Sequence, residues 1–100
     1  MGKRATEYTN FEEDLLENLE DDAFMTAFLN DAASDDHPDE FLRALRWVVL
    51  ARGGFEQFAK STELGQSSLY RMLDTDGNPR LSSIRAVLDS LGLKIRVDAA

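Results

Sequence analysis

Apolar residues recur along the chain at the spacing of amphipathic helices. Residues 10–33 predict two short helices, the second with Phe24 and Phe28 on its apolar stripe. A third helix, over residues 38–52, is apolar on two faces that only arginines interrupt. A helix that is apolar nearly all round packs against neighbours on more than one side. We therefore expect it to pack both on the downstream helices and on the stripe of Phe24 and Phe28.

Start and stop signals mark the helix ends. Asp21 or Asp22 offers an N-cap for the second helix, and Gly53-Gly54 supplies the left-handed C-cap that ends the third. Further helices are predicted over residues 55–62, over residues 66–73 and from Ser82 or Ser83 onward. Residues 93–97 alternate apolar and basic side chains, which predicts a short strand. Because this strand has no partner in its own chain, we expect it to pair with a second copy or another protein.

The segment 55–73 meets the requirements of a helix-turn-helix unit. Two short helices that cross steeply need a small residue where they touch, and Ala59 lies there. The turn needs an apolar plug and a residue that tolerates positive φ, which Leu64 and Gly65 supply. The second helix must bury one face while its N-terminal turn stays polar enough to enter the major groove. Its inward residues are Leu69, Met72 and Leu73, and its outward residues are Gln66, Ser67, Ser68 and Arg71.

The outward polar residues are candidate DNA contacts, and each has a structural alternative. Arg71 can bind guanine in bidentate fashion, or pair with Asp74 on the surface. Gln66 or Ser67 can instead cap the helix. Tyr70 can pack at the domain edge or donate its hydroxyl to a phosphate. The candidate DNA-binding residues are Gln57, Lys60, Gln66, Ser67, Ser68, Tyr70 and Arg71, and further candidates are Arg80 and Arg85.

Charge is divided unevenly along the chain. Residues 1–40 hold two basic and thirteen acidic residues, a net charge of −11, whereas residues 41–100 hold nine basic and six acidic residues, a net of +3, which together give the −8 of the whole chain. Such asymmetry indicates two different partners, or an acidic arm on a DNA-facing module. The alternative is that the acids only solvate the N-terminal helices. We divide the chain into an acidic helical extension, residues 1–36, and a helix-turn-helix domain, residues 37–100.

Nothing in the sequence indicates an active site. The chain has no cysteine and one histidine, His37, which lies in an acidic connector. Asp35, Asp36 and Asp39 lack the glycine and terminal glutamate of an EF-hand loop, so they indicate a solvated loop rather than a metal site. No apolar run approaches the length of a membrane span, and the N-terminus lacks the apolar core of a signal peptide. We expect a cytoplasmic protein that is not an enzyme and binds no cofactor.

Several short runs resemble one known family. They are Leu29-Asn30-Asp31-Ala32-Ala33, Ala51-Arg52-Gly53-Gly54-Phe55, Leu64-Gly65-Gln66-Ser67-Ser68-Leu69-Tyr70-Arg71, Gly77-Asn78-Pro79-Arg80-Leu81-Ser82-Ser83 and Leu91-Gly92-Leu93-Lys94. In these runs the chain resembles the antidote (antitoxin) proteins of bacterial addiction modules, the HigA-like group within the Xre/Cro type. The resemblance implies an all-α fold: a five-helix lambda-repressor-like helix-turn-helix domain with an N-terminal helical extension and a short C-terminal strand.

The resemblance also implies two partners. It implies a homodimer that binds its own operator through Gln66, Ser67, Ser68 and Arg71, and a small RelE-like ribonuclease toxin. Because a protein that grips RNA should be basic, an acidic surface would attract it, and the candidate toxin face includes Phe24, Phe28 and neighbouring acids. With Arg71 as its only cation, the recognition helix depends on dimerisation for its grip on DNA. Two alternatives are a stand-alone prophage-type repressor without a toxin partner and a protein-interaction module that has lost DNA binding.

Overall fold

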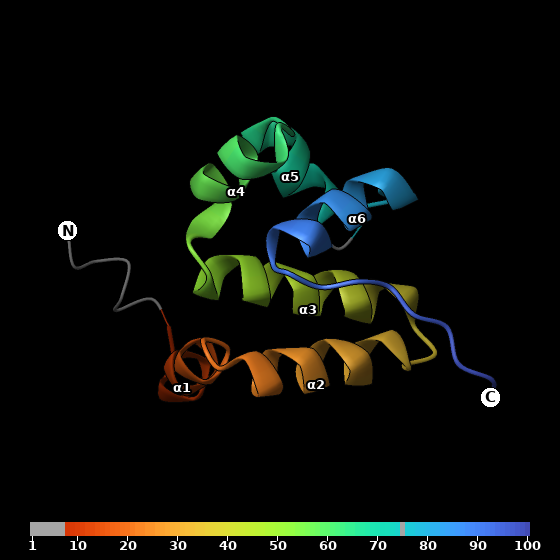
Figure 1. Cartoon of the computed structure of the whole chain (residues 1–100). Helices are drawn as coiled ribbons and strands as arrows, with labels where there is room; N and C mark the ends of the chain where they lie inside the picture. The colour runs from red at the N-terminus through yellow and green to blue at the C-terminus, as the bar shows by residue number, and fades with distance from the viewer. Residues whose placement is uncertain (1–7, 75) are drawn as a thin grey trace.

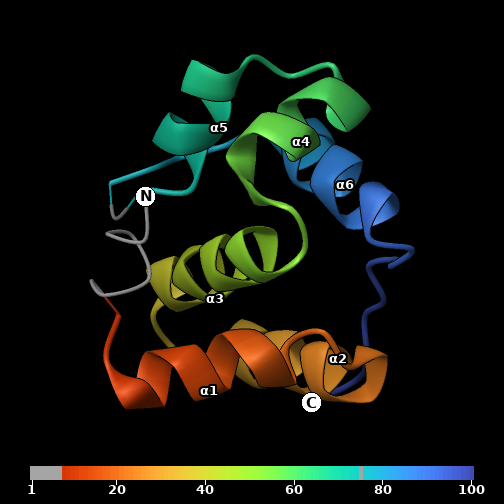
Figure 2. The ribbon, with the colours of Figure 1, turned by 90° about the vertical axis from the view of Figure 1, so that its left-hand side faces the viewer.

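The computed structural model describes residues 8–74 and 76–100, which form helices in three layers (Figure 1). The lower layer holds α1 (Asn10–Asn18) and α2 (Asp22–Ala33), and α3 (Pro38–Ala51) lies above them. The upper layer holds α4 (Gly54–Thr62), α5 (Gln66–Met72) and α6 (Leu81–Ser90). Since α1, α2 and α4 all contact α3, the middle helix connects the two halves of the chain, as Figure 2 shows from the side.

Local side-chain bonds explain where the lower helices begin. Thr9 and Glu12 form a capping box: the hydroxyl of Thr9 accepts from the N–H of Glu12 at 3.1 Å, and the Glu12 carboxylate accepts from the N–H of Thr9 at 3.0 Å. Asp21 caps α2 by accepting from the N–H of Phe24 at 2.9 Å, which decides between the two predicted caps. Pro38 is the first residue of α3, as predicted.

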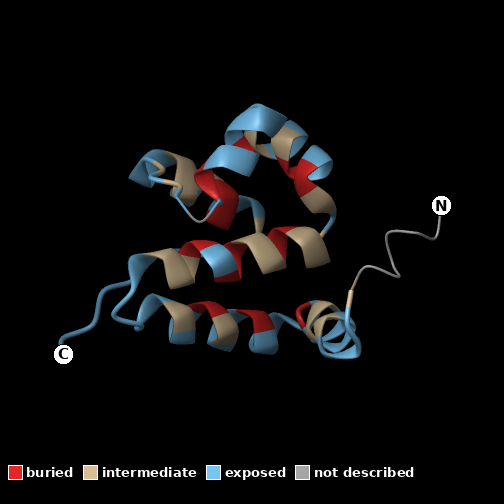
Figure 3. Ribbon diagram, turned by 180° about the vertical axis from the view of Figure 1, so that it is seen from behind, coloured by how far each residue is buried: buried red, intermediate tan, exposed pale blue. Residues whose placement is uncertain are grey.

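The core is one apolar cluster that runs through all three layers. The prediction that the third helix packs on more than one side is confirmed, because α3 buries residues towards both of its neighbouring layers. Figure 3 shows the buried stretches of the outer layers facing inward. The buried residues are Leu19, Met25 and Leu29 below, Leu42, Ala44, Leu45, Val48 and Val49 in α3, and Phe55, Phe58, Leu69, Met72, Leu73, Val87 and Leu88 above.

The turns follow the prediction at α3 and depart from it between α4 and α5. Gly53 and Gly54 have φ values of +131° and +90°, so both take backbone conformations that suit glycine at the end of α3. In the turn before α5, the left-handed residue is Glu63, with φ +64°, and not Gly65, with φ −67°. The reason is that the chain turns at the C-cap of α4, after which Gly65 is extended as the N-cap of α5. Leu64 packs against the core as the predicted plug.

The predicted C-terminal strand is wrong for the described residues, in which no strand forms. An isolated extended segment has no neighbouring strand to accept its backbone hydrogen bonds. Instead, the N–H of Leu93 donates to the carbonyl oxygen of Leu88 at 2.8 Å, and the chain beyond Leu93 is exposed.

The predicted number of helices also needs correction. The described part of residues 37–100 contains four helices rather than five, because Gly92, with φ +78°, ends α6 and no helix follows it. α6 itself begins at Leu81 with Arg80 as its N-cap, so neither Ser82 nor Ser83 starts it. None of the helices in residues 8–74 and 76–100 is long and apolar enough to cross a membrane.

Candidate nucleic-acid interface

The seven residues of α5 divide sharply between a buried and an exposed face. Leu69 is fully buried and Met72 is 8% exposed, and both belong to the core, as does Leu73 just after the helix. The outward face is made of short hydrogen-bonding side chains and one cation. All four residues that the sequence assigned to this face, Gln66, Ser67, Ser68 and Arg71, are exposed.

The structure removes two of the alternative roles for this face. The N-cap residue of α5 is Gly65, and no side-chain hydrogen bond caps the helix. Neither Gln66 nor Ser67 is therefore the cap. Arg71 forms no ion pair with any described residue, so surface pairing with Asp74 does not account for it. The outward side chains of α5 therefore retain their hydrogen-bonding capacity for a partner.

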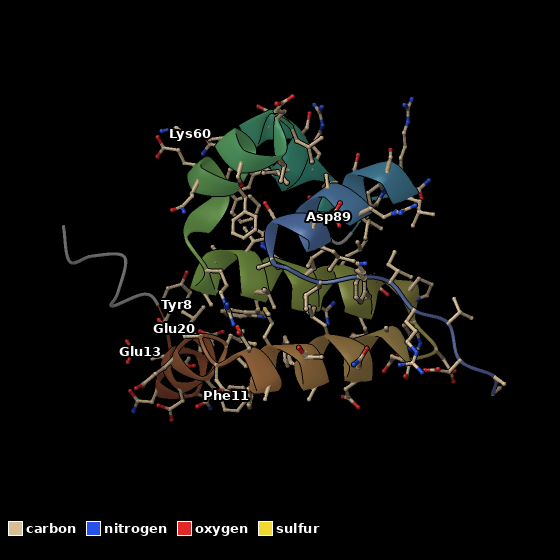
Figure 4. All side chains as sticks on the ribbon, viewed as in Figure 1. Tyr8, Phe11, Glu13, Glu20, Lys60 and Asp89 are labelled. Atoms are coloured by element: carbon tan, nitrogen blue, oxygen red, sulfur yellow. The ribbon has the colours of Figure 1, made fainter. Side chains whose placement is uncertain are left out.

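Gln57 and Lys60 lie on α4, the helix that precedes the turn. Both are exposed, and Lys60 projects at the upper edge of the molecule, where α4 and α5 lie together (Figure 4). Lys60 is in the last turn of α4, where a cation is favourable for the helix dipole. Figure 4 thus shows Lys60 at the same end of the molecule as α5, whereas the Gln57 side chain lies beside Gly53, at the start of α4. Arg80 and Arg85 are exposed at the beginning and in the middle of α6.

Tyr70 packs on a neighbouring ring, which is one of its two predicted roles. Its ring is stacked on Phe55 with centroids 4.2 Å apart and planes 3° apart. The guanidinium of Arg46 lies 5.4 Å from the centre of Phe55 and 6.0 Å from that of Tyr70. Ring stacking contributes about 0.5–1.5 kcal/mol beyond area burial. The arrangement ties α5 to α4 and α3, and it leaves Tyr70 46% exposed.

Arg46 is a residue whose position sequence analysis did not interpret. The available signal was an arginine interrupting an otherwise apolar face of the third helix. Beside the stack lies a hollow of about 520 Å³, which is lined by Tyr8, Asp39, Arg43, Arg46, Trp47, Leu50, Phe55, Tyr70, Leu73 and Asp74. Its lining contains two arginines and two aspartates, so the formal charges balance and select neither an anion nor a cation.

Of the two aromatic residues in the proposed toxin face on α2, one packs against the core and the other is exposed. Phe24 and Phe28 stack with centroids 6.2 Å apart and planes 17° apart. Phe28 packs against the core, whereas Phe24 is 38% exposed. On α1, Phe11 is 76% exposed. Exposed aromatic side chains of this kind are common in protein interfaces.

The acidic connector before α3 is closed by a local turn. The backbone N–H of His37 donates to the Asp35 carboxylate at 2.8 Å, and the His37 ring nitrogen Nδ1 lies 3.1 Å from the same oxygen. The backbone bond, followed by the side-chain bond, lowers the pKa of Asp35 below its ordinary value. Within residues 8–74 and 76–100, no three histidine or acidic residues gather in a way that could hold a metal ion.

Arg52 connects the N-terminal helices to α3. Its Nε donates to the carbonyl oxygen of Leu19 at 2.9 Å, and its Nη2 donates to the Asp22 carboxylate at 2.8 Å. The two acceptors lie at the junction of α1 and α2. This one side chain therefore bonds the junction of α1 and α2 to the end of α3, in addition to the apolar contacts between these layers.

The fold and its polar faces define an all-helical protein with a short, exposed polar helix in its C-terminal half. The chain belongs to the family described as "Probable addiction module antidote protein", whose model matches residues 7–99. This match confirms the resemblance to antidote proteins. It does not address the HigA-like or Xre/Cro subdivision.

One curated relative comes from Haemophilus influenzae and is described as an uncharacterized protein. It is 27% identical to this chain over 84 residues, which cover 84% of the chain and 86% of the relative. Comparison with solved structures finds no match.

Proposed function

We propose that this antidote protein is the antitoxin of a type II toxin-antitoxin module. In this proposal it neutralises a RelE-like toxin and represses its own operon by binding the operator through a HigA-like, Xre/Cro-type helix-turn-helix unit. The observation that carries the DNA-binding part is the outward face of α5. Its polar side chains do not cap the helix, its arginine forms no ion pair with another described residue, and its opposite face is apolar and buried. These residue types match the donors and acceptors of base edges in the major groove.

The proposed contacts divide into two kinds. Gln66, Ser67, Ser68 and Arg71 read base edges, and Gln57, Lys60 and Tyr70 contact the DNA backbone. Phosphate contacts position a protein on the duplex, and base contacts specify the sequence. With one cation on α5, a single chain makes few charged contacts, so we propose that a homodimer binds two half-sites.

The toxin part of the proposal is supported by charge and by family membership. An antidote implies a toxin partner, and residues 1–40 carry a net charge of −11. An acidic surface attracts a basic ribonuclease and covers its RNA site. Phe24 and Phe28 supply an apolar contact on the same layer. The proposed activity is binding alone, with no catalytic step or cofactor, in the cytoplasm.

Replacing Arg71 tests the DNA-binding proposal. Arg71→Ala is expected to weaken binding to a fragment carrying the protein's own promoter by about 1–3 kcal/mol, because a bidentate base contact is lost. Fluorescence anisotropy at two salt concentrations measures the effect, and wild-type affinity should fall steeply with salt as phosphate contacts are screened.

Arg96→Ala is the matched control for Arg71→Ala. Arg96 lies in the exposed C-terminal segment, with its Nε 3.4 Å from Oδ1 of Asp98. Its replacement removes the same charge as Arg71→Ala does and leaves α5 unchanged. Equal promoter affinity in the Arg71 and Arg96 variants would exclude Arg71 from the interface. If the protein binds the promoter but does not restore growth to a strain that expresses the toxin, it is instead a stand-alone repressor.

A further inference from the structure

A groove runs between α1 and the C-terminal end of α3. It encloses about 450 Å³ and is lined by Tyr8, Glu13, Leu16, Glu17, Glu20, Leu50 and Ala51. We refer to it as the α1–α3 groove. Figure 2 shows α1 and α3 one above the other, and Figure 4 shows Tyr8, Glu13 and Glu20 gathered at that end of the molecule. It lies away from Lys60 and the α5 face, so DNA and a second partner would not compete for it.

The lining combines an apolar floor with an acidic edge. Leu16, Leu50 and Ala51 are half-buried, and Leu50 and Ala51 pack against the core. Glu13 and Glu17 are exposed on the same side of α1, one helical turn apart, and Glu20 is exposed in the turn that follows the helix. Tyr8 is held at the groove by its contact with Trp47, the ring centroids being 6.1 Å apart.

Contacts among the residues that the structure describes do not explain the acids of the groove. Among the described residues, Glu13, Glu17 and Glu20 form no ion pair. The last turn of α1 holds Glu17 but no basic residue, and a negative charge at that end of a helix is unfavourable. A cation that entered the groove would relieve this repulsion. The repulsion destabilises the isolated chain, and binding of a basic partner would remove it.

From these features we infer that the α1–α3 groove docks a basic, amphipathic segment of the toxin. The aliphatic stems of lysine or arginine side chains would lie on Leu16, Leu50 and Ala51, with their charged ends on the three carboxylates. A helix laid into a groove with apolar and charged anchors is a common mode of recognition. This inference rests on the proposed function and places the toxin contact on α1 and α3, beyond the face of Phe24 and Phe28.

Charge favours the toxin over a second copy of this chain. A symmetric pairing of two α1 helices would bring together two layers that each belong to a segment of net charge −11. Like charges placed opposite each other across an interface are strongly unfavourable. A basic segment from a different protein has the complementary charge, and the apolar floor gives it a contact that free cations cannot make.

A direct binding assay tests the groove without requiring the toxin. The probe is a fluorescein-labelled synthetic helix with lysine on one face and leucine on the other, titrated with the full chain at physiological salt. Glu13→Gln/Glu17→Gln/Glu20→Gln is expected to weaken binding about tenfold, because three charge pairs are lost. The control Asp14→Asn/Asp31→Asn/Asp36→Asn makes the same change in net charge on exposed positions outside the groove and should weaken binding far less.

A second variant separates groove binding from simple charge attraction. Ala51→Phe fills the floor of the groove and leaves all three glutamates in place. If the aliphatic stems of the peptide's lysines enter the groove, this variant should also bind the peptide more weakly. Circular dichroism and the melting temperature check that each variant folds. Equal weakening by the two triple variants, or wild-type affinity in Ala51→Phe, overturns the docking site.

Co-expression with the toxin distinguishes failure of this inference from failure of the proposed function. The same variants are tested for restored growth with the product of an adjacent basic reading frame. Loss of rescue in the groove triple, with rescue by the control triple, supports the inference. Full rescue by the groove triple overturns the docking site and leaves the antitoxin function standing. Absence of rescue by the wild-type chain overturns the antitoxin function, and with it the identity of the docked segment.

Discussion

Arg43, Arg46 and Arg52 lie on or just after the same helix, and their surroundings give each a different role. Arg43 pairs with Glu40 at 2.9 Å on the surface, where both side chains are well exposed. Arg46 lies over the rings of Phe55 and Tyr70. The side chain of Arg52 is only 22% exposed and bonds to a carbonyl oxygen and a carboxylate. Water therefore competes far more for the bond of Arg43 than for the part-buried bond between Arg52 and the Leu19 carbonyl, although the Asp22 carboxylate is itself 85% exposed.

Arg52→Met should therefore destabilise the protein more than Arg43→Met does. Loss of the Arg52 bonds leaves the Leu19 carbonyl without this donor, at a cost of about 1–3 kcal/mol. Loss of the exposed Arg43 pair costs about 0.2–1 kcal/mol. Urea denaturation monitored by circular dichroism measures both. Equal midpoints for the two variants would show that Arg52 does not anchor the N-terminal layer.

At the scale of elements, the turn after α5 is packed against the end of the helix it follows. A Cβ at Gly77 would meet the carbonyl oxygen of Met72 at less than contact distance and that of Arg71 at 2.8 Å, and both are backbone atoms with little freedom to move. Gly65, at the other end of α5, has only the Ser68 hydroxyl nearby, at 3.8 Å. The two glycines therefore bound the same short helix but are constrained differently.

Gly77→Ala is expected to lower the free energy of unfolding by about 1–3 kcal/mol, because the added methyl group displaces the end of α5. Gly65→Ala has room for its methyl group and a negative φ, so its effect should stay within about 1 kcal/mol. Thermal melts of the two variants give the comparison. A Gly77 variant as stable as the Gly65 variant would show that the turn is not tightly packed.

At the scale of the whole molecule, the acidic layer shares its core with the upper helices. Leu29 in α2 and Leu69 in α5 are both buried in the single cluster that α3 joins. Removing residues 1–36 would uncover the lower side of α3, so the charge of this layer is better tested by exposed substitutions than by truncation. The division of the chain at residues 36 and 37 stays a prediction about organisation.

A shared core predicts that the two halves unfold together. Leu29→Ala and Leu69→Ala should each cost about 2–5 kcal/mol and move one common transition to lower temperature. Calorimetry and far-UV circular dichroism would follow the same melts. A separate, earlier transition in the Leu29 variant alone would show that α1 and α2 unfold independently of the helices above them.

Much of the helical framework follows from the sequence by itself. Apolar spacing predicted α3 as the buried helix and its start at residue 38, Asp21 was one of the two predicted caps of α2, and Gly53-Gly54 marked an end. The division of α5 into buried Leu69 and exposed Ser67 was equally readable. These features depend on interactions within about one helical turn, so the local order of residues is enough to determine them.

Only the tertiary structure decided how distant segments meet. It placed Arg46 over Phe55 and Tyr70, brought Leu16 beside Leu50 in the α1–α3 groove, left Phe11 exposed and assigned the left-handed turn to Glu63 instead of Gly65. It also left residues 93–97 unpaired, since alternation predicts a strand only where another strand is present. Helical periodicity identifies which face of a segment is apolar, but the partner of that face is chosen by packing across the whole chain.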